Sequence, residues 1–292
     1  MTIAVAAGKG GTGKTLLSTS LALSLNESYP GKVQLLDCDV EEPNADLLMR
    51  SEFDQSDDVH ILVPQVDLDK CSRCGACAKK CEFAAIAVIN DAVLTFPELC
   101  AGCGVCAYVC PTRAIEEVKR KVGTVSVGTA GNGLKFVQGR VKVGETRSGP
   151  VTKATKKLLR DDMINIVDSP PGTACPMQET VEGSDFCILI TERTPFGLSD
   201  LEAAVETCKA LEVPVGIVIN RDRPGFDGLD EYCTRSGIPV LLRIPEKREI
   251  AEAYSKGVTL TEAFPEWGRQ LIDMFENIAS QCSQGEKQNA KS

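Results

Sequence analysis

The sequence has few aromatic residues, little positive charge and a single histidine. Aromatic residues make up 5% of its 292 residues, and 32 basic against 41 acidic side chains leave a net charge of −9. An acidic chain without basic clusters is poorly suited to bind nucleic acid or an anionic membrane, so we expect neither as a partner. The histidine, His60, has no evident partner in the sequence, which argues against histidine-based catalysis.

Long apolar runs are also absent. No stretch of about 18 apolar residues occurs, so no transmembrane helix is expected. The first residues, Met1 to Val5, lack the basic region and the cleavage site of a signal peptide. We therefore expect a cytoplasmic protein. Hydrophobic residues, at 43% of the chain, are numerous enough to form a core.

Cysteine is abundant instead, with fourteen residues. In a cytoplasmic chain, cysteines are more often metal ligands or small buried residues than disulfide partners. Eight of them fall between Cys71 and Cys110. Three of the scattered ones, Cys38, Cys187 and Cys208, lie in apolar strand or helix patterns, which favours core packing for them.

Strand and helix patterns alternate at both ends of the chain. Helical spacing at 14–26, 197–211, 227–236, 246–256 and 265–281 predicts helices. Such alternation is typical of an α/β domain with a mostly parallel sheet. The buried strands are predicted at 3–7, 33–37, 164–168, 186–191, 215–220 and 240–244.

The alternation breaks off in the middle, where the cysteines gather. A connection between parallel strands runs over the surface and can host a domain. We therefore predict one α/β domain made of residues 1–63 and 150–282, with a cysteine-rich insert at 64–118. A β-hairpin return segment at 119–149 would lead back to the domain. The polar residues 283–292 predict a disordered tail.

A glycine-rich loop joins the first predicted strand to the first predicted helix. Residues 8–15 match the phosphate-binding pattern G-x-x-x-x-G-K-[ST]. We expect Lys14 to reach the β and γ phosphates of a nucleotide and Thr15 to bind Mg²⁺. A glycine turn without a ligand is the alternative, but the flanking strand and helix favour phosphate binding. The predicted ATP ligands in the loop are Gly8, Lys9, Gly10, Gly11, Thr12, Gly13, Lys14 and Thr15.

The eight clustered cysteines form two equal runs. Each run has the spacing C-x2-C-x2-C-x3-C, so the second run, from Cys100 to Cys110, repeats the first, from Cys71 to Cys81. Three cysteines at two-residue intervals can wrap three corners of a [4Fe–4S] cube, with the fourth ligand coming from elsewhere. A structural zinc ion normally uses two well-separated pairs, and free thiols would leave the duplication unexplained. The spacing therefore predicts two [4Fe–4S] clusters.

The runs resemble those of bacterial two-cluster ferredoxins, in which the fourth cysteine of each run binds the other cluster. Glu82 departs from that pattern, because a proline normally follows the fourth cysteine, and a nearby carboxylate tends to lower a cluster's potential. The resemblance implies a first cluster on Cys71, Cys74, Cys77 and Cys110, and a second cluster on Cys100, Cys103, Cys106 and Cys81.

The rest of the chain resembles the MinD/ParA/nitrogenase iron protein superfamily. Lys9, the second lysine of the loop, matches the deviant Walker A motif of these proteins. Residues 35–39 (Leu-Leu-Asp-Cys-Asp) resemble the end of their switch I strand, and residues 164–172 resemble their switch II strand. Residues 220–222 (Asn-Arg-Asp) resemble their adenine-reading segment. The resemblance implies a MinD-like P-loop NTPase fold with an inserted ferredoxin domain.

The resemblance also implies roles in ATP hydrolysis, which many members of the superfamily carry out slowly without a partner. Lys9 would cross a dimer interface to the partner's nucleotide, in a homodimer or in a heterodimer with a related ATPase. Asp39 would orient the attacking water, and Asp37 would lie near Mg²⁺. Asp168 would hold Mg²⁺ through water. The implied catalytic residues are Lys9, Lys14, Asp39 and Asp168.

For some residues a simpler structural role also fits the sequence, besides the role that the resemblance implies. Asn220 and Arg221 would contact the adenine, but Asn220 also fits a helix cap or a turn. Asp37 and Asp39 also fit the solvated end of a strand, although two carboxylates at the end of a parallel strand face the ligand side of the sheet.

Cys175 lies seven residues after Asp168. The nitrogenase iron protein has a cluster ligand at a similar distance past switch II, and its cluster bridges two subunits. No second cysteine lies suitably upstream in the predicted ATPase domain. Cys175 fits a labile cluster ligand and, equally, a small residue in a tight turn before Pro176.

Three functions fit the sequence. The first is an ATP-gated carrier of low-potential electrons to a partner protein. The second is an assembly scaffold or carrier for iron–sulfur clusters or metal cofactors, like Mrp and Nbp35. The third, a MinD-like positioning ATPase, ranks last because residues 266–282 carry one arginine and three acidic residues instead of a basic membrane-binding face. Two complete cluster sites favour the electron carrier, because a scaffold needs an open or labile site.

Overall fold

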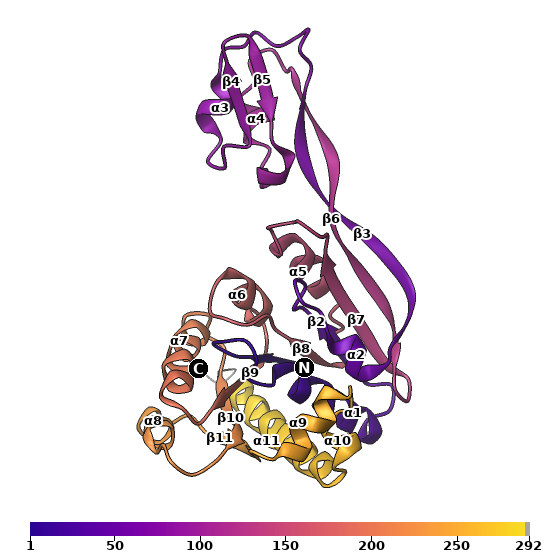
Figure 1. Cartoon of the computed structure of the whole chain (residues 1–292), viewed down its shortest axis with the longest axis vertical. Helices are drawn as coiled ribbons and strands as arrows, with labels where there is room; N and C mark the ends of the chain where they lie inside the picture. The colour runs from indigo at the N-terminus through magenta and orange to yellow at the C-terminus, as the bar shows by residue number, and fades with distance from the viewer. Residues whose placement is uncertain (290–292) are drawn as a thin grey trace.

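One nine-stranded sheet forms the centre of the molecule (Figure 1). The computed structural model describes residues 1–289, and the side chains of residues 1–283, and its strand order is β11-β10-β9-β1-β8-β2-β7-β6-β3. The strands from β11 to β7 are parallel, and β6 and β3 add to this edge in antiparallel fashion. The expected mostly parallel α/β sheet is confirmed. The strands are β1 (Thr2–Ala6), β2 (Val33–Asp37), β3 (Glu52–Val66), β6 (Ile115–Ala130), β7 (Leu134–Val141), β8 (Ile164–Asp168), β9 (Phe186–Glu192), β10 (Val215–Asp222) and β11 (Val240–Pro245).

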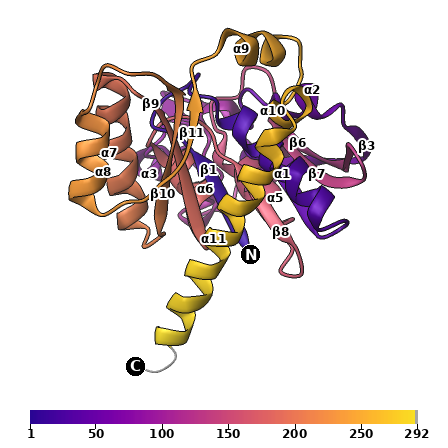
Figure 2. The same cartoon turned by 90° about the horizontal axis from the view of Figure 1, so that it is seen from below.

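Helices cover both faces of the parallel strands (Figures 1 and 2). Strands buried on both faces read as continuous apolar runs, which is why β1 can be recognised in the sequence. One face packs against α1 (Lys14–Ser28), α2 (Ala45–Met49), α9 (Arg248–Ser255), α10 (Leu260–Ala263) and α11 (Glu266–Asn289). The other face packs against α5 (Gly149–Lys156), α6 (Cys175–Val181), α7 (Pro195–Ala210) and α8 (Gly228–Ser236).

Strands β3 and β6 extend beyond the other strands as a two-stranded arm (Figure 1). They pair from Glu52 with Thr129 to Val66 with Ile115. The arm carries the insert, residues 67–114, at its far end (Figure 1). The insert contains α3 (Ala76–Lys80), β4 (Ile86–Ile89), β5 (Ala92–Thr95), the 3-10 helix η1 (Pro97–Leu99) and α4 (Val105–Tyr108).

Two expected boundaries need correction. Residues 119–149 do contain a hairpin of β6 and β7, but it is not a separate return segment, because both strands belong to the main sheet and β7 pairs in parallel with β2. The predicted disordered tail starts inside α11, which continues to Asn289. Glutamine, glutamate and lysine propagate a helix well once its first turns are packed. Residues 290–292 of that expected tail lie outside the described residues.

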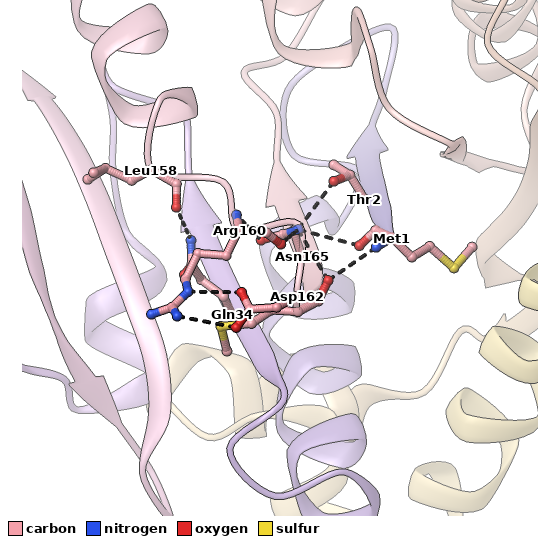
Figure 3. A network of polar contacts seen from close by, with 8 residues as sticks. Met1, Thr2, Gln34, Leu158, Arg160, Asp162 and Asn165 are labelled. Atoms are coloured by element: carbon pink, nitrogen blue, oxygen red, sulfur yellow. Dashed lines mark hydrogen bonds and ion pairs between the residues drawn. The ribbon is translucent and has the colours of Figure 1, made fainter.

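A buried asparagine fixes the end of the sheet opposite the phosphate loop (Figure 3). The Asn165 side-chain amide donates to Arg160 O at 2.9 Å and to Thr2 Oγ1 at 3.3 Å, and its oxygen accepts from Arg160 N. Gln34 on β2 donates to Leu158 O at 2.8 Å. These bonds hold β1, β2 and β8 in place around the turn that precedes β8.

No helix in the described part of the chain is long and apolar enough to cross a membrane.

Candidate nucleotide site and cysteine sites

The phosphate loop lies between β1 and α1, and its shape requires its glycines. Gly11 and Gly13 have φ angles of 75° and 99°, which side chains rarely tolerate. A Cβ on Gly8 would lie 2.2 Å from Asp200 O of α7, so the loop packs directly on that helix. The loop is therefore held in one conformation by close backbone packing.

Asn220, in the last part of β10, braces the loop. Its side-chain amide donates to Thr12 O at 2.7 Å, and its oxygen accepts from Arg221 N at 2.9 Å. A Cβ on Gly13 would lie 2.4 Å from Asn220 Nδ2, so only glycine leaves room for this bond. Asn220 therefore supports the loop, a role that the sequence does not indicate. It also lines the cavity described next, where Arg221 lies beside it.

A cavity of about 660 Å³ opens over the phosphate loop. This volume lies within the usual range for small-molecule sites. Its walls include Lys14, Thr15 and Asp39 on one side and parts of the segment 245–254 on the other. Sequence patterns predict a helix in that segment but do not assign it to the site, because its contribution depends on how the helix packs.

Two aspartates lie side by side at the carboxyl ends of neighbouring strands. Asp37 on β2 and Asp168 on β8 are partners in the parallel register, and both are fully buried. Asp37 accepts hydrogen bonds from Asp39 N and Ala45 N, each at 3.2 Å. Burial and the neighbouring Asp168 raise the pKa of Asp37 well above its usual value. Two buried carboxylates this close are costly without a nearby cation.

The carboxyl groups of Asp168 and Asp39 also have pKa values above their usual range. Burial raises the pKa of Asp168 to about 6, against the lowering effect of Lys14 and of the Thr15 and Ser18 hydroxyls. Burial, with Asp168, raises the pKa of Asp39 to about 6, again opposed by Lys14. Perturbed carboxylates in a cavity are typical of functional sites.

The chemistry of this region fits a magnesium-bound nucleotide. Among the described residues, no group makes a well-aligned hydrogen bond to either buried oxygen of Asp168 or to the buried Thr12 hydroxyl. The Thr15 and Ser18 hydroxyls lie close enough to lower the Asp168 pKa but do not satisfy its oxygens. Hydrated Mg²⁺ would supply the missing partners, and Lys14, only 6% exposed, would meet the phosphates.

Lys9 makes its ion pair away from the phosphate cavity. Its ammonium lies 3.7 Å from Glu192, and its side chain is 35% exposed. Glu192 also forms an ion pair with Arg221. A contact this long and this exposed stabilises the chain little, so Lys9 can leave it at small cost.

The eight clustered cysteines gather around two separate cavities in the insert. The cross-paired sets that the ferredoxin resemblance implies are the sets that the structure brings together. Leu62 and Pro64 of β3 line the second cavity and Val66 lines the first, so the second lies nearer the main sheet. The first cavity is lined by Cys71, Cys74, Cys77 and Cys110, and the second by Cys81, Cys100, Cys103 and Cys106.

The sequence duplication is also a duplication of conformation. Ala85 N donates to Cys81 Sγ at 3.3 Å, and at the matching place in the second run Ala114 N donates to Cys110 Sγ at 3.2 Å. Hydrogen bonds to cysteine sulfurs are one of the ways in which a protein tunes a cluster. The glycines that follow the second cysteine of each run, Gly75 and Gly104, both have left-handed backbones, with φ of 73° and 71°.

No three His, Cys, Asp or Glu side chains in the described part of the chain converge tightly enough to hold one metal ion. A [4Fe–4S] cluster is held by four cysteines, one for each iron atom, so its ligands surround a volume and not a point. The two four-cysteine cavities fit that donor arrangement.

Cys175 lies outside both cavities. It is the first residue of α6 and is exposed. Cys38, Cys187 and Cys208 are buried in the apolar clusters between the sheet and helices α5 to α8, where they pack as expected.

Comparison with known proteins shows the family and the fold of the nucleotide-binding part of the chain. The chain matches the CobQ/CobB/MinD/ParA nucleotide binding domain over residues 3–260. An uncharacterized protein of Methanocaldococcus jannaschii is 33% identical over 283 residues, which is 96% of this chain and 97% of that protein. An iron–sulfur cluster carrier protein of Pyrococcus furiosus is 28% identical over 45% of this chain and 54% of the carrier. The cell division ATPase MinD of Pyrococcus furiosus has a TM-score of 0.56 at 19% identity, covering 95% of this chain and 98% of MinD.

The fold and the phosphate loop thus define a P-loop nucleotide-binding protein of the α/β class. The chain belongs to the CobQ/CobB/MinD/ParA nucleotide-binding family.

The raised carboxylate pKa values predict a pH-dependent stability. The folded chain binds protons at Asp39 and Asp168 more tightly than the unfolded chain, so this contribution favours folding at low pH and is lost as pH rises through about 6. Without nucleotide, the free energy of unfolding should fall by on the order of 1 kcal/mol for Asp168 between about pH 5 and about pH 7. Urea unfolding of the wild type and of Asp168→Asn measures the change.

The Asp168→Asn variant should lose most of that pH dependence, because the Asp168 charge also helps to raise the pKa of Asp37 and of Asp39. Asp161→Asn, a change at an exposed residue outside the site, should keep it. Equal pH dependence in the wild type and in Asp168→Asn would contradict the assignment.

Proposed function

We propose that this chain couples its nucleotide state to low-potential electron transfer through two [4Fe–4S] clusters to a partner protein. The observation that carries the proposal is that each of two cavities is lined by a complete set of four cysteines. A cluster with four protein thiolates has no open iron position, which suits a resident redox centre better than a cluster in transit. Bound clusters would supply one-electron chemistry.

The chain's own residues provide the nucleotide half of the proposal. Lys14 and the loop N–H groups would bind the phosphates, while Thr15 and Asp168 would hold hydrated Mg²⁺. Asp39, at the cavity wall, would orient the attacking water. Phosphoryl transfer needs mainly positioning and charge neutralisation, and these groups would supply both.

A dimer would complete the site. Lys9 makes its ion pair outside the phosphate cavity and can leave Glu192 at small cost. We propose that it reaches the nucleotide of a second ATPase subunit, which is another copy of this chain or a related protein. Hydrolysis would then open a dimer that ATP had closed.

The position of the insert supports a link between its clusters and the nucleotide. Strand β6 begins at Ile115, shortly after Cys110, and continues into the main sheet. There β7 connects it to β2, which ends at Asp37. A change at the nucleotide therefore has a continuous path of hydrogen-bonded strands to the insert.

A second candidate function is transfer of an iron–sulfur cluster to other proteins. Cys175 favours it, because this cysteine is exposed and begins the helix that follows Asp168. The iron–sulfur cluster carrier of Pyrococcus furiosus is also a relative of part of the chain. In this alternative, two copies of Cys175 would hold a labile cluster, and Cys175→Ser would abolish cluster transfer to an apo-protein.

The pairing of cysteines predicts the iron content of double variants. The wild type should hold about eight iron atoms, as two [4Fe–4S] clusters require. Cys74→Ser with Cys110→Ser damages one proposed cluster and should leave about four, whereas Cys74→Ser with Cys81→Ser damages both and should leave almost none. Anaerobic iron analysis and EPR of the reduced protein measure this.

Cys175→Ser is the matched control and should keep about eight iron atoms. Equal iron loss in the two double variants would contradict the pairing.

The coupling itself is tested by reductive titration followed by EPR, with and without Mg-ATP. The potential of at least one cluster should shift when Mg-ATP binds, because the switch strands and the insert are connected. Lys14→Ala removes the main phosphate contact, so it should abolish both ATP hydrolysis and the shift. If neither the cluster potentials nor the docking of a partner changed with nucleotide in the wild type, the gated carrier would be ruled out.

A further inference from the structure

A short segment between β7 and α5 makes a second contact between the insert and the ATPase body. We name this segment, residues 142–148, the strap. Arg147 of the strap donates from Nη2 to Leu99 O at 2.6 Å. Its guanidinium carbon lies 4.5 Å from the centre of the Phe83 ring. The insert is therefore bound to the body at the strap as well as through the arm.

Both groups that Arg147 contacts are next to ligands of the second cluster. Leu99 directly precedes Cys100, which is 7% exposed. Phe83 lies two residues after Cys81 and lines the same cavity. A movement of Arg147 is therefore transmitted to two of the four cysteines of this cavity through one or two residues of backbone.

Glu145 of the strap holds the backbone at Arg147, and Glu145 is itself tied to the arm part of β6. Glu145 accepts hydrogen bonds from the backbone N–H groups of Thr146 and Arg147. The Glu145 side chain is only 2% exposed and forms an ion pair with Arg120 of β6 at 2.6 Å. Arg147 therefore starts from a fixed backbone, so its guanidinium follows the position of the strap and of α5.

Helix α5 follows the strap directly and shares one apolar cluster with residues of both switch strands. Its Val151 is fully buried in one apolar cluster with Cys38, which follows β2, and Val167, which precedes Asp168 on β8. A shift of either switch strand on nucleotide binding would therefore press on α5.

Helix α5 also contacts α6, which follows switch II. Lys156 donates to Glu179 O at 2.8 Å and to Glu182 O at 2.6 Å. Lys153 lies 3.5 Å from Glu179 in an ion pair. Residues on each side of the switch II turn are thus linked to α5.

We infer that Arg147 relays the nucleotide state from the switch strands, through α5 and the strap, to the second cluster. This inference rests on the proposed function, because it assumes that the clusters and the nucleotide are coupled. Arg147 is a positioning residue here, since it touches neither the nucleotide nor a cysteine. The first cluster, which lies farther along the arm, would respond only indirectly.

The contact is weak enough to be made and broken. It consists of one hydrogen bond and one cation–π contact on the insert surface, where Phe83 is 43% exposed and Leu99 is 48% exposed. Among the described residues, no group accepts a hydrogen bond from the buried Arg147 Nε. A contact of this size can change with nucleotide without unfolding the insert.

Hydrogen–deuterium exchange of the full-length, cluster-loaded protein tests the relay. In the wild type, a non-hydrolysed Mg-ATP analogue should change the exchange of residues 97–104 and 142–148. In Arg147→Gln without nucleotide, residues 97–104 should exchange about three- to tenfold faster, as expected for losing one hydrogen bond and one ring contact. The analogue should then have no effect on residues 97–104 but should still protect residues 8–15.

Arg73→Gln is the matched control. Arg73 donates to Asp91 O at 2.9 Å within the insert, next to the first cluster. It resembles Arg147 in bonding a backbone carbonyl, but this bond lies beside the first cluster and not between the strap and the insert. Replacing Arg73 should therefore leave the response of residues 97–104 intact. Should Arg147→Gln fail to retain its clusters, Arg147→Lys keeps the charge but lacks the planar fork, and the same loss of response is expected.

The outcomes separate the relay from the proposed function. A response of residues 97–104 that is equal in the wild type and in the Arg147 variants overturns the relay, and so does the absence of any response in the wild type. The EPR titration of the wild type decides the proposed function by itself. A nucleotide-dependent shift in the second cluster's potential that persists in Arg147→Gln would leave the proposed function standing and remove the relay.

Discussion

Two carboxylates lie opposite each other on paired parallel strands, shut off from solvent, and this pair governs the electrostatics of the whole nucleotide site. Asp37 and Asp168 are fully buried register partners on β2 and β8. Lost hydration raises both pKa values, and the Asp168 charge raises that of Asp37 further. Backbone N–H groups donate hydrogen bonds to Asp37, but among the described residues neither oxygen of Asp168 has a hydrogen-bond partner. In the proposed nucleotide complex, Lys14 and a magnesium ion would be the counter-charges, which would tie β2 and β8 to the presence of a nucleotide.

The cysteine-rich insert lies between these same two strands in the chain. The path from Asp37 to Asp168 runs along β3 to the insert, back along β6 and β7, and through α5. Strand β7 pairs with β2, and α5 packs beside residues that flank both aspartates. The geometry therefore offers two routes between the cavity over the phosphate loop and the two four-cysteine cavities, the arm and the strap. The strap leads to the cavity lined by Cys81, Cys100, Cys103 and Cys106, and its last contact is made by Arg147.

The phosphate loop, the switch strands and the two cysteine runs can be predicted from short patterns, because neighbouring residues must wrap a phosphate or a cluster. The buried parallel strands can be predicted because both of their faces are apolar. Contacts between distant residues escape such patterns. Strand β3 begins with a polar run that lacks strand periodicity, and it forms because β6 pairs along its length. Asn220 supports a loop 208 residues earlier. The Arg147 side chain is positioned by a hydrogen bond to Leu99 O and a cation–π contact with Phe83, both far from it in the sequence.

Nucleotide affinity in two redox states is the sharpest probe of the proposed coupling. If nucleotide changes the cluster potentials, thermodynamic reciprocity requires that reduction changes the nucleotide affinity by the same factor. The dissociation constant of a non-hydrolysed Mg-ATP analogue should therefore differ between the oxidised and the dithionite-reduced protein, and a tenfold ratio would correspond to a potential shift of about 59 mV. Equal dissociation constants in the two states would contradict the coupling of nucleotide and clusters.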